Sequence, residues 1–183
     1  MLYRVFPWLR EASERDPGGA MFVPRSEQGF GRHDNPAWYG ALYLSRAAVS
    51  SVAEVLRTFR RQRVETSDLV HEEAILALAA FDPPTLTLVD LDDPAQLQRR
   101  GLRPSSVATG NRRVTRPVAA DLFAEGHDGF EWWSTIEASW INITLFAERS
   151  IDRLVVEGEP EVLTTHHPAV IEAAEVVGVE LAG

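Results

Sequence analysis

Residues 38–61 read WYGALYLSRAAVSSVAEVLRTFRR, and the hydrophobic pattern changes within this stretch. The first part, Trp38 to Ser45, is aromatic and apolar, which is typical of a β-strand. The second part repeats apolar side chains at helical spacing, and Ser45 can cap a helix that we expect to end near Arg61. The apolar stripe of this helix consists of Val49, Val52, Ala53, Leu56 and Phe59. A strand followed directly by an amphipathic helix predicts a mixed α and β fold.

The same mixture continues outward from this pair. Strands are predicted over residues 2–6, 86–91, 130–134, 140–146 and 154–157, and helices over residues 94–100, 115–125 and 168–177. Residues 74–81 fit either a helix or a strand. Residues 11–36 are rich in Gly, Pro and polar side chains, which predicts a long loop, and such loops are often functional. No repeat or linker interrupts the chain, so we expect one α+β domain over residues 1–183.

The composition excludes several kinds of chemistry. The chain has no cysteine, so it cannot form disulfides, thiolate nucleophiles or zinc sites built on sulfur. All 18 basic residues are arginines, which excludes a Schiff-base lysine and a P-loop lysine. The net charge of -9 argues against nucleic-acid binding. No apolar run is long enough to span a membrane and no secretory leader is visible, so we expect a cytoplasmic protein without a membrane partner.

The predicted long loop ends in GFGRHDNP, residues 29–36. Its two glycines allow the backbone to approach a ligand closely, and Arg32 can hold an anion through a bidentate contact. The alternative interpretation is a plain turn closed by an Arg–Asp pair. The two neighbouring histidines, His166 and His167, cannot share a metal ion if they lie on a strand, and we predict no metal site.

Three other side chains could face a ligand. Glu54 shares a helical face with the small residues Ala47, Ser50, Ser51 and Thr58, which leaves room beside its carboxylate; a solvated face is the alternative. Tyr43 could stack on a flat cationic ring or pack in the core. Thr115, at a predicted helix start, could place backbone N–H donors near a phosphate or simply cap the helix.

Several segments, in order, resemble the RES domain, a family named for its Arg, Glu and Ser. They are Leu2–Val5, Gly31–Pro36, Leu42–Ser45 with Ala53–Leu56, Val114–Ala119, and Gly129–Ser134 with Asn142–Phe146. Arg32 and Tyr43 are as far apart in the sequence as Tyr43 and Glu54, which also fits the family. The chain departs from the family pattern at His33-Asp34, where the family has a tryptophan, and at Trp133, where proline is usual before Ser134.

The resemblance implies a fold similar to that of ADP-ribosylating toxins and an active site that degrades NAD. Nicotinamide leaves NAD as a neutral ring, so the main need is to stabilise the oxocarbenium-like ribose that remains. The resemblance assigns this role to Glu54 and the stacking on nicotinamide to Tyr43. Arg4 and Arg32 are expected to hold the pyrophosphate or an incoming phosphate. A hydroxyl contact is expected from Thr115 or Ser134.

The sequence leaves the reaction partners open. NAD is expected as a substrate rather than a resident cofactor, with water or inorganic phosphate as acceptor. A transferase that moves ADP-ribose onto a macromolecule, and a non-catalytic module that binds a nucleotide or protein, are the alternatives. Many relatives are toxins silenced by an antitoxin that enters the NAD pocket, which implies an antitoxin partner. Five tryptophans fit either a homo-oligomer interface or core packing.

Overall fold

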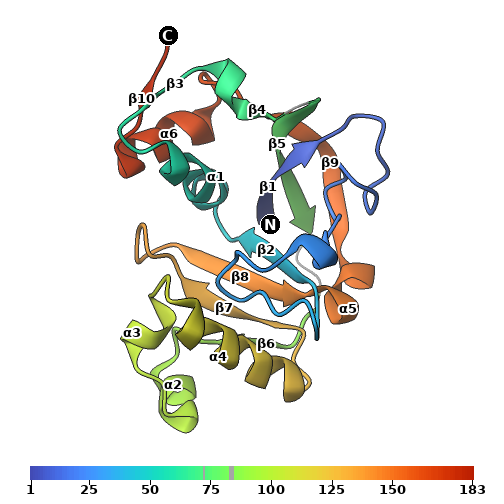
Figure 1. Ribbon diagram of the computed structural model, residues 1–183, viewed down its shortest axis with the longest axis vertical. Helices are drawn as coiled ribbons and strands as arrows, with labels where there is room; N and C mark the ends of the chain where they lie inside the picture. Colours follow the sequence, from blue (N-terminus) through green and yellow to red (C-terminus); the bar gives the residue numbers. More distant parts are fainter. Residues whose placement is uncertain (72, 83–84) are drawn as a thin grey trace. The chain divides into compact units, whose positions relative to one another are not determined.

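The computed structural model describes residues 1–71, 73–82 and 85–183, and the chain divides into two compact units. Unit 1 consists of Met1–Phe22, Ser45–Pro83 and Val155–Gly183, and unit 2 consists of Val23–Leu44 and Pro84–Leu154. Each unit contains both helices and strands (Figure 1), so the α+β class is confirmed. A single domain over residues 1–183 stays a prediction.

Unit 1 is built around the antiparallel pair β1 (Leu2–Trp8) and β5 (Ala74–Asp82). The ambiguous segment 74–81 is therefore a strand, since its backbone pairs with β1 along nearly its whole length. β5 also pairs with β4 (Val70–His71) and β9 (Val155–Val162). β9 extends beyond the predicted 154–157 because its mostly exposed residues give no apolar signal. A short parallel pair joins β3 (Arg63–Val64) to β10 (Glu180–Leu181).

In unit 1 the α-helices α1 (Ala48–Leu56) and α6 (Pro168–Val177) pack against each other. The bounds of α6 match the prediction, and Gly178 ends it in the left-handed region with φ 72°. The prediction that Ser45 caps α1 is wrong, because Ser45 pairs with Tyr3 as a strand residue and Ala47 precedes the helix. α1 is also shorter than expected and ends at Leu56.

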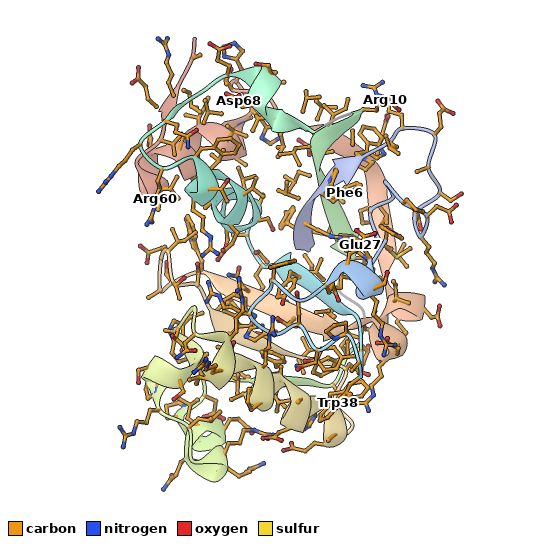
Figure 2. The ribbon with its side chains drawn as sticks, in the orientation of Figure 1. Phe6, Arg10, Glu27, Trp38, Arg60 and Asp68 are labelled. Carbon is orange, nitrogen blue, oxygen red and sulfur yellow. The ribbon has the colours of Figure 1, made fainter. Side chains whose placement is uncertain are left out.

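The strands of unit 2 follow the spatial order β2 (Ala41–Ser45, whose last residue belongs to unit 1), β8 (Ile141–Phe146), β7 (Gly129–Trp133) and β6 (Leu88–Asp90). β7 is antiparallel to β8 and parallel to β6. β2 begins three residues later than predicted, because Trp38 and Tyr39 lie in a turn whose N–H groups donate to the carbonyl oxygen of Asn35. Trp38 is 58% exposed and lies at the surface (Figure 2).

The helices α2 (Pro94–Arg100), α3 (Pro104–Val107) and α4 (Arg112–Ala124) lie together on one side of β7 and β6 (Figure 1). The short helix α5 (Ala147–Ser150) follows β8. The core of unit 2 lies between helices and strands and includes Leu97, Val107, Leu122, Val89 and Phe130. None of the helices in the described ranges is long and apolar enough to cross a membrane.

The prediction that Thr115 caps a helix is wrong. α4 begins three residues earlier, and the side chain of Asn111 caps it by accepting from the N–H of Arg113 at 3.1 Å. Thr115 is therefore an internal helix residue and is 2% exposed. Its backbone N–H donates to the carbonyl oxygen of Asn111 and so does not offer a donor to a phosphate.

Candidate functional site

The turn at residues 29–36 is organised by the carboxylate of Asp34. Its Oδ2 accepts hydrogen bonds from the N–H groups of Gly29 at 2.9 Å and Gly31 at 2.7 Å. Its Oδ1 accepts a hydrogen bond of 2.6 Å from the hydroxyl of Tyr43 on β2. The carboxylate therefore closes the turn through backbone donors and ties it to a strand of unit 2.

Gly31 is required where it stands in this turn. A Cβ on this residue would lie 2.4 Å from Oδ1 of Asp34 and 2.5 Å from the hydroxyl oxygen of Tyr43. These distances are far shorter than van der Waals contact, so a side chain would displace the carboxylate or the tyrosine. We expected the glycine to let the backbone approach a ligand closely. In the structure the backbone at Gly31 approaches two side chains of the protein itself, those of Asp34 and Tyr43.

The hydroxyl of Tyr43 is used twice, because it also accepts a hydrogen bond from the N–H of His33 at 3.0 Å. Burial and then the neighbouring Asp34 raise the pKa of Tyr43 well above its usual value, so the hydroxyl stays protonated and remains a donor. Tyr43 is half-buried, and its ring centroid lies 6.1 Å from that of His33, with an angle of 27° between the ring planes. Its expected role, stacking on nicotinamide, stays a prediction.

The guanidinium of Arg32 is held over an aromatic ring. Its central carbon lies 4.6 Å from the centroid of Trp132, a cation–π distance. Nη2 donates to the hydroxyl oxygen of Thr135 at 2.9 Å, and the carbonyl oxygen of Arg32 accepts a hydrogen bond of 2.5 Å from the hydroxyl of Thr115. Both the backbone and the side chain of Arg32 are therefore fixed before any ligand binds, which lowers the entropy lost on binding.

His33 is a buried core residue. The centroid of its ring lies 4.8 Å from that of Phe130 and 5.1 Å from that of Trp132, and both contacts are edge to face. Its Nδ1 lies 2.8 Å from the hydroxyl oxygen of Thr144. Burial and the charge of Arg32 lower the pKa of His33 to about 3, so the ring is neutral at physiological pH. His33 thus occupies an aromatic pocket formed with Phe130 and Trp132.

Helix α4 holds the Arg32 turn through three hydrogen bonds. Besides the bond from Thr115, the guanidinium of Arg116 donates to the carbonyl oxygen of Gly29. The amide of Asn35 donates to the carbonyl oxygen of Arg116 at 3.1 Å. The sequence pattern did not single out Arg116, although it directly follows Thr115 in a segment that resembles the family.

Thr135, the residue after the predicted Ser134, accepts a hydrogen bond from the guanidinium of Arg32. Ser134 is 2% exposed, its Oγ accepts a hydrogen bond from the N–H of Ile136 at 3.1 Å, and its N–H donates to the carbonyl oxygen of Trp140. These bonds shape the turn that carries Thr135. The expected contact of Ser134 with a ligand stays a prediction, and unit 2 therefore brings together Arg32, Tyr43, Thr115 and, beside the predicted serine, Thr135.

The other two predicted residues, Arg4 and Glu54, lie in unit 1. The guanidinium of Arg4 donates to the carbonyl oxygens of Ala20 at 2.5 Å and Phe22 at 3.0 Å. Burial lowers the pKa of Arg4 to about 10, so it remains charged at neutral pH. These bonds tie the end of the first loop segment to β1, a structural task that the sequence did not predict.

Glu54 lies on α1, and 25% of its side chain is exposed. Its Oε2 lies 3.3 Å from Nη1 of Arg57, three residues later on the same helix. The small residues predicted beside it are only partly solvated, since Ser50 and Ser51 are buried and the hydroxyl of Ser51 donates to the carbonyl oxygen of Tyr3 at 2.8 Å. The serines therefore let α1 approach β1 closely.

No group of three or more metal-binding side chains occurs within residues 1–71, 73–82 and 85–183.

Comparison with known proteins bears on the family and the fold of this chain. The RES domain family model matches residues 1–166. A chain in the crystal structure of the M. tuberculosis MbcT–MbcA toxin–antitoxin complex has a similar fold, with a TM-score of 0.66 and 18% sequence identity. The match covers 97% of this chain and 88% of that chain. A search of curated proteins found no match. Because the family model matches most of its length, this chain belongs to the RES domain family.

Proposed function

We propose that this protein cleaves the bond between nicotinamide and ribose in NAD. The observation that carries the proposal is the position of the Arg32 guanidinium, which contacts the ring of Trp132 and the hydroxyl of Thr135. Arg32 itself lies in the turn at residues 29–36, whose sequence resembles that of the RES family. An arginine placed in advance in this way is suited to a phosphate or pyrophosphate oxygen.

The reaction requires little from an acid catalyst. The C1′–N bond of NAD breaks, and its electron pair leaves with nicotinamide, whose ring becomes neutral. The carboxylate of Glu54 stabilises the positive charge that develops on the ribose, and Tyr43 stacks on the departing ring. An oxygen of water or inorganic phosphate then bonds to C1′. Water loses a proton to give ADP-ribose, and phosphate gives ADP-ribose phosphate.

The contacts in the structure refine the roles of the remaining residues. The hydroxyl of Thr115 donates to the carbonyl oxygen of Arg32, so Thr115 supports the reaction by holding Arg32 in place. Arg4 keeps its proposed role toward the pyrophosphate, although its guanidinium also binds two backbone carbonyl oxygens. Ser134 keeps its proposed hydroxyl contact with the ligand. The hydroxyl of the next residue, Thr135, is bonded to Arg32.

The proposal extends to a toxin that an antitoxin inhibits. The similar solved fold comes from a toxin–antitoxin complex, and an enzyme that consumes NAD in the cytoplasm would need such control. A partner that fills the NAD site would provide it. A transferase with a macromolecular acceptor is the second candidate, and it predicts slow nicotinamide release with water alone.

The test is to incubate the purified protein with NAD, with and without inorganic phosphate, and to quantify nicotinamide, ADP-ribose and ADP-ribose phosphate. Glu54→Gln removes the proposed catalytic charge, and Glu172→Gln, on the exposed face of α6, is the matched control. Nicotinamide release that is lost only in Glu54→Gln supports the proposal, and the product identifies the acceptor. Absence of release under both conditions, or unchanged release in Glu54→Gln, contradicts it.

A further inference from the structure

The charges of this chain are unevenly distributed along the sequence. Residues 94–120, which we call the arginine segment, contain six arginines and no acidic residue. The rest of the chain carries 12 arginines and 27 acidic residues. A phosphate-bearing molecule is therefore attracted by this segment, whereas the rest of the chain is mainly acidic apart from a second arginine cluster at residues 57–63.

Most of these arginines are available to solvent. Arg99, Arg103, Arg112 and Arg113 are exposed, and within the part of the chain that the structure describes none of the four takes part in an ion pair. Arg100 is different, because it pairs with Glu125 at 2.6 Å. The positive charge of the segment is thus largely uncompensated at the surface of unit 2.

The arginine segment leads directly to the turn that carries Arg32. Thr115 and Arg116 on α4 bond to the carbonyl oxygens of Arg32 and Gly29. Arg112 precedes these two residues by three and four positions, so it shares their helix face, one turn away. Arg113 precedes Arg116 by three positions, at the edge of the same face. Three arginines, Arg112, Arg113 and Arg116, therefore lie in the first two turns of the helix that holds the Arg32 turn.

We propose that the arginine segment guides phosphate-bearing ligands to Arg32, with Arg112 and Arg113 as the members that matter most. This inference rests on the proposed function for its substrate, NAD or inorganic phosphate. The surface suits a small anion better than a nucleic acid, because a long polyanion would extend beyond the segment and meet the acidic remainder of the chain. Guidance of this kind accelerates association and weakens as salt screens the charges.

The kinetic test compares R112E/R113E with R60E/R61E, which makes the same change of net charge at two exposed arginines of unit 1. Nicotinamide release from NAD is measured at about 10 mM and about 300 mM ionic strength, where the screening length falls severalfold. We expect R112E/R113E to lower kcat/KM about tenfold at low salt, with kcat nearly unchanged and the difference much smaller at high salt. The control is expected to change kcat/KM less than about twofold at either salt concentration. An equal loss in both variants, or a loss that does not depend on salt, overturns the inference.

A binding test separates this inference from the proposed function. Calorimetric titration with inorganic pyrophosphate needs no turnover, and we expect its affinity to fall about tenfold in R112E/R113E and to stay unchanged in R60E/R61E. If the wild type releases no nicotinamide, the proposed function fails and this titration alone decides the inference. Unchanged pyrophosphate affinity in R112E/R113E overturns it. The inference is also overturned if R112E/R113E binds a labelled oligothymidylate more weakly than the wild type but binds pyrophosphate equally well. Near-UV circular dichroism confirms that both variants are folded.

Discussion

The hydroxyl of Tyr43 donates a 2.6 Å hydrogen bond to Oδ1 of Asp34, while Oδ2 of the same carboxylate accepts from the N–H groups of Gly29 and Gly31. One side chain thus connects a strand to both glycines of the turn that carries Arg32. The carboxylate of Asp34 therefore helps to position Arg32 through the backbone of the turn.

Replacement of Asp34 by alanine is expected to destabilise the protein by about 2–4 kcal/mol, because three donors lose a charged acceptor. The variant Asp34→Asn keeps one acceptor oxygen and is expected to cost about half as much. Urea unfolding with tryptophan fluorescence measures both effects. Asp92→Ala, at an exposed position, is the control and should change the free energy of unfolding by less than about 0.5 kcal/mol. A loss in Asp34→Ala no larger than in the control would disprove the role of this carboxylate.

Gly31→Ala is expected to cost at least about 2 kcal/mol, since its methyl group would collide with Asp34 and Tyr43. Gly110→Ala is the matched control, because a Cβ at Gly110 meets no atom within 4 Å. Thermal unfolding of the two variants side by side measures the difference. Equal midpoints would show that the turn can relax around the added methyl group.

Removal of the bonds from α4 is expected to loosen the Arg32 turn without unfolding unit 2. In Thr115→Val and Arg116→Ala, hydrogen exchange at the amides of residues 29–32 should accelerate about fivefold or more, since each lost bond contributes roughly 1 kcal/mol or more. If the proposed function holds, kcat/KM for NAD falls together with this protection. Thr115→Ser retains the hydroxyl and should behave as wild type. Unchanged exchange in Thr115→Val would rule out this role of α4.

His33 is expected to make the protein less stable in mild acid. Its pKa is about 3 in the folded state and near 6.5 when exposed, so below pH 6.5 the unfolded chain binds a proton that the folded chain does not. The free energy of unfolding should therefore fall by about 1.4 kcal/mol per pH unit between roughly pH 6 and pH 4. His33→Phe keeps an aromatic ring beside Phe130 and Trp132 and removes the titration. Urea unfolding across this range should show a shallower pH dependence in His33→Phe, and identical slopes would refute the assignment.

The sequence predicts most of the fold where local patterns and tertiary contacts agree. The helices at 94–100 and 168–177 are predicted with their observed bounds, because each has a proline near its start and a left-handed glycine after its end. β9 was predicted too short, since it depends on pairing with β5 and carries mostly exposed side chains. Ser45 and Thr115 were both misread as caps because a hydroxyl residue before an apolar run gives the same signal inside a strand or a helix.

The candidate site was only partly predictable. Arg32 and Tyr43 could be named from their sequence context, but the partners that fix them could not. Asp34 and Arg116 act through backbone atoms of the turn, and His33 through a ring environment supplied by β7. Such contacts join residues far apart in the chain, or depend on turn geometry that no periodic pattern encodes.

The packing of α6 against α1 limits how far this protein can be truncated at its C-terminal end. The region that the family model matches ends at residue 166, yet the partner of the helix that carries Glu54 begins only at Pro168. α6 buries Val170, Ala173, Ala174 and Val177, so a fragment trimmed to the matched region would expose the part of α1 that packs against α6. The family match at residues 1–166 thus leaves out α6, the helix that packs against α1 and supports Glu54.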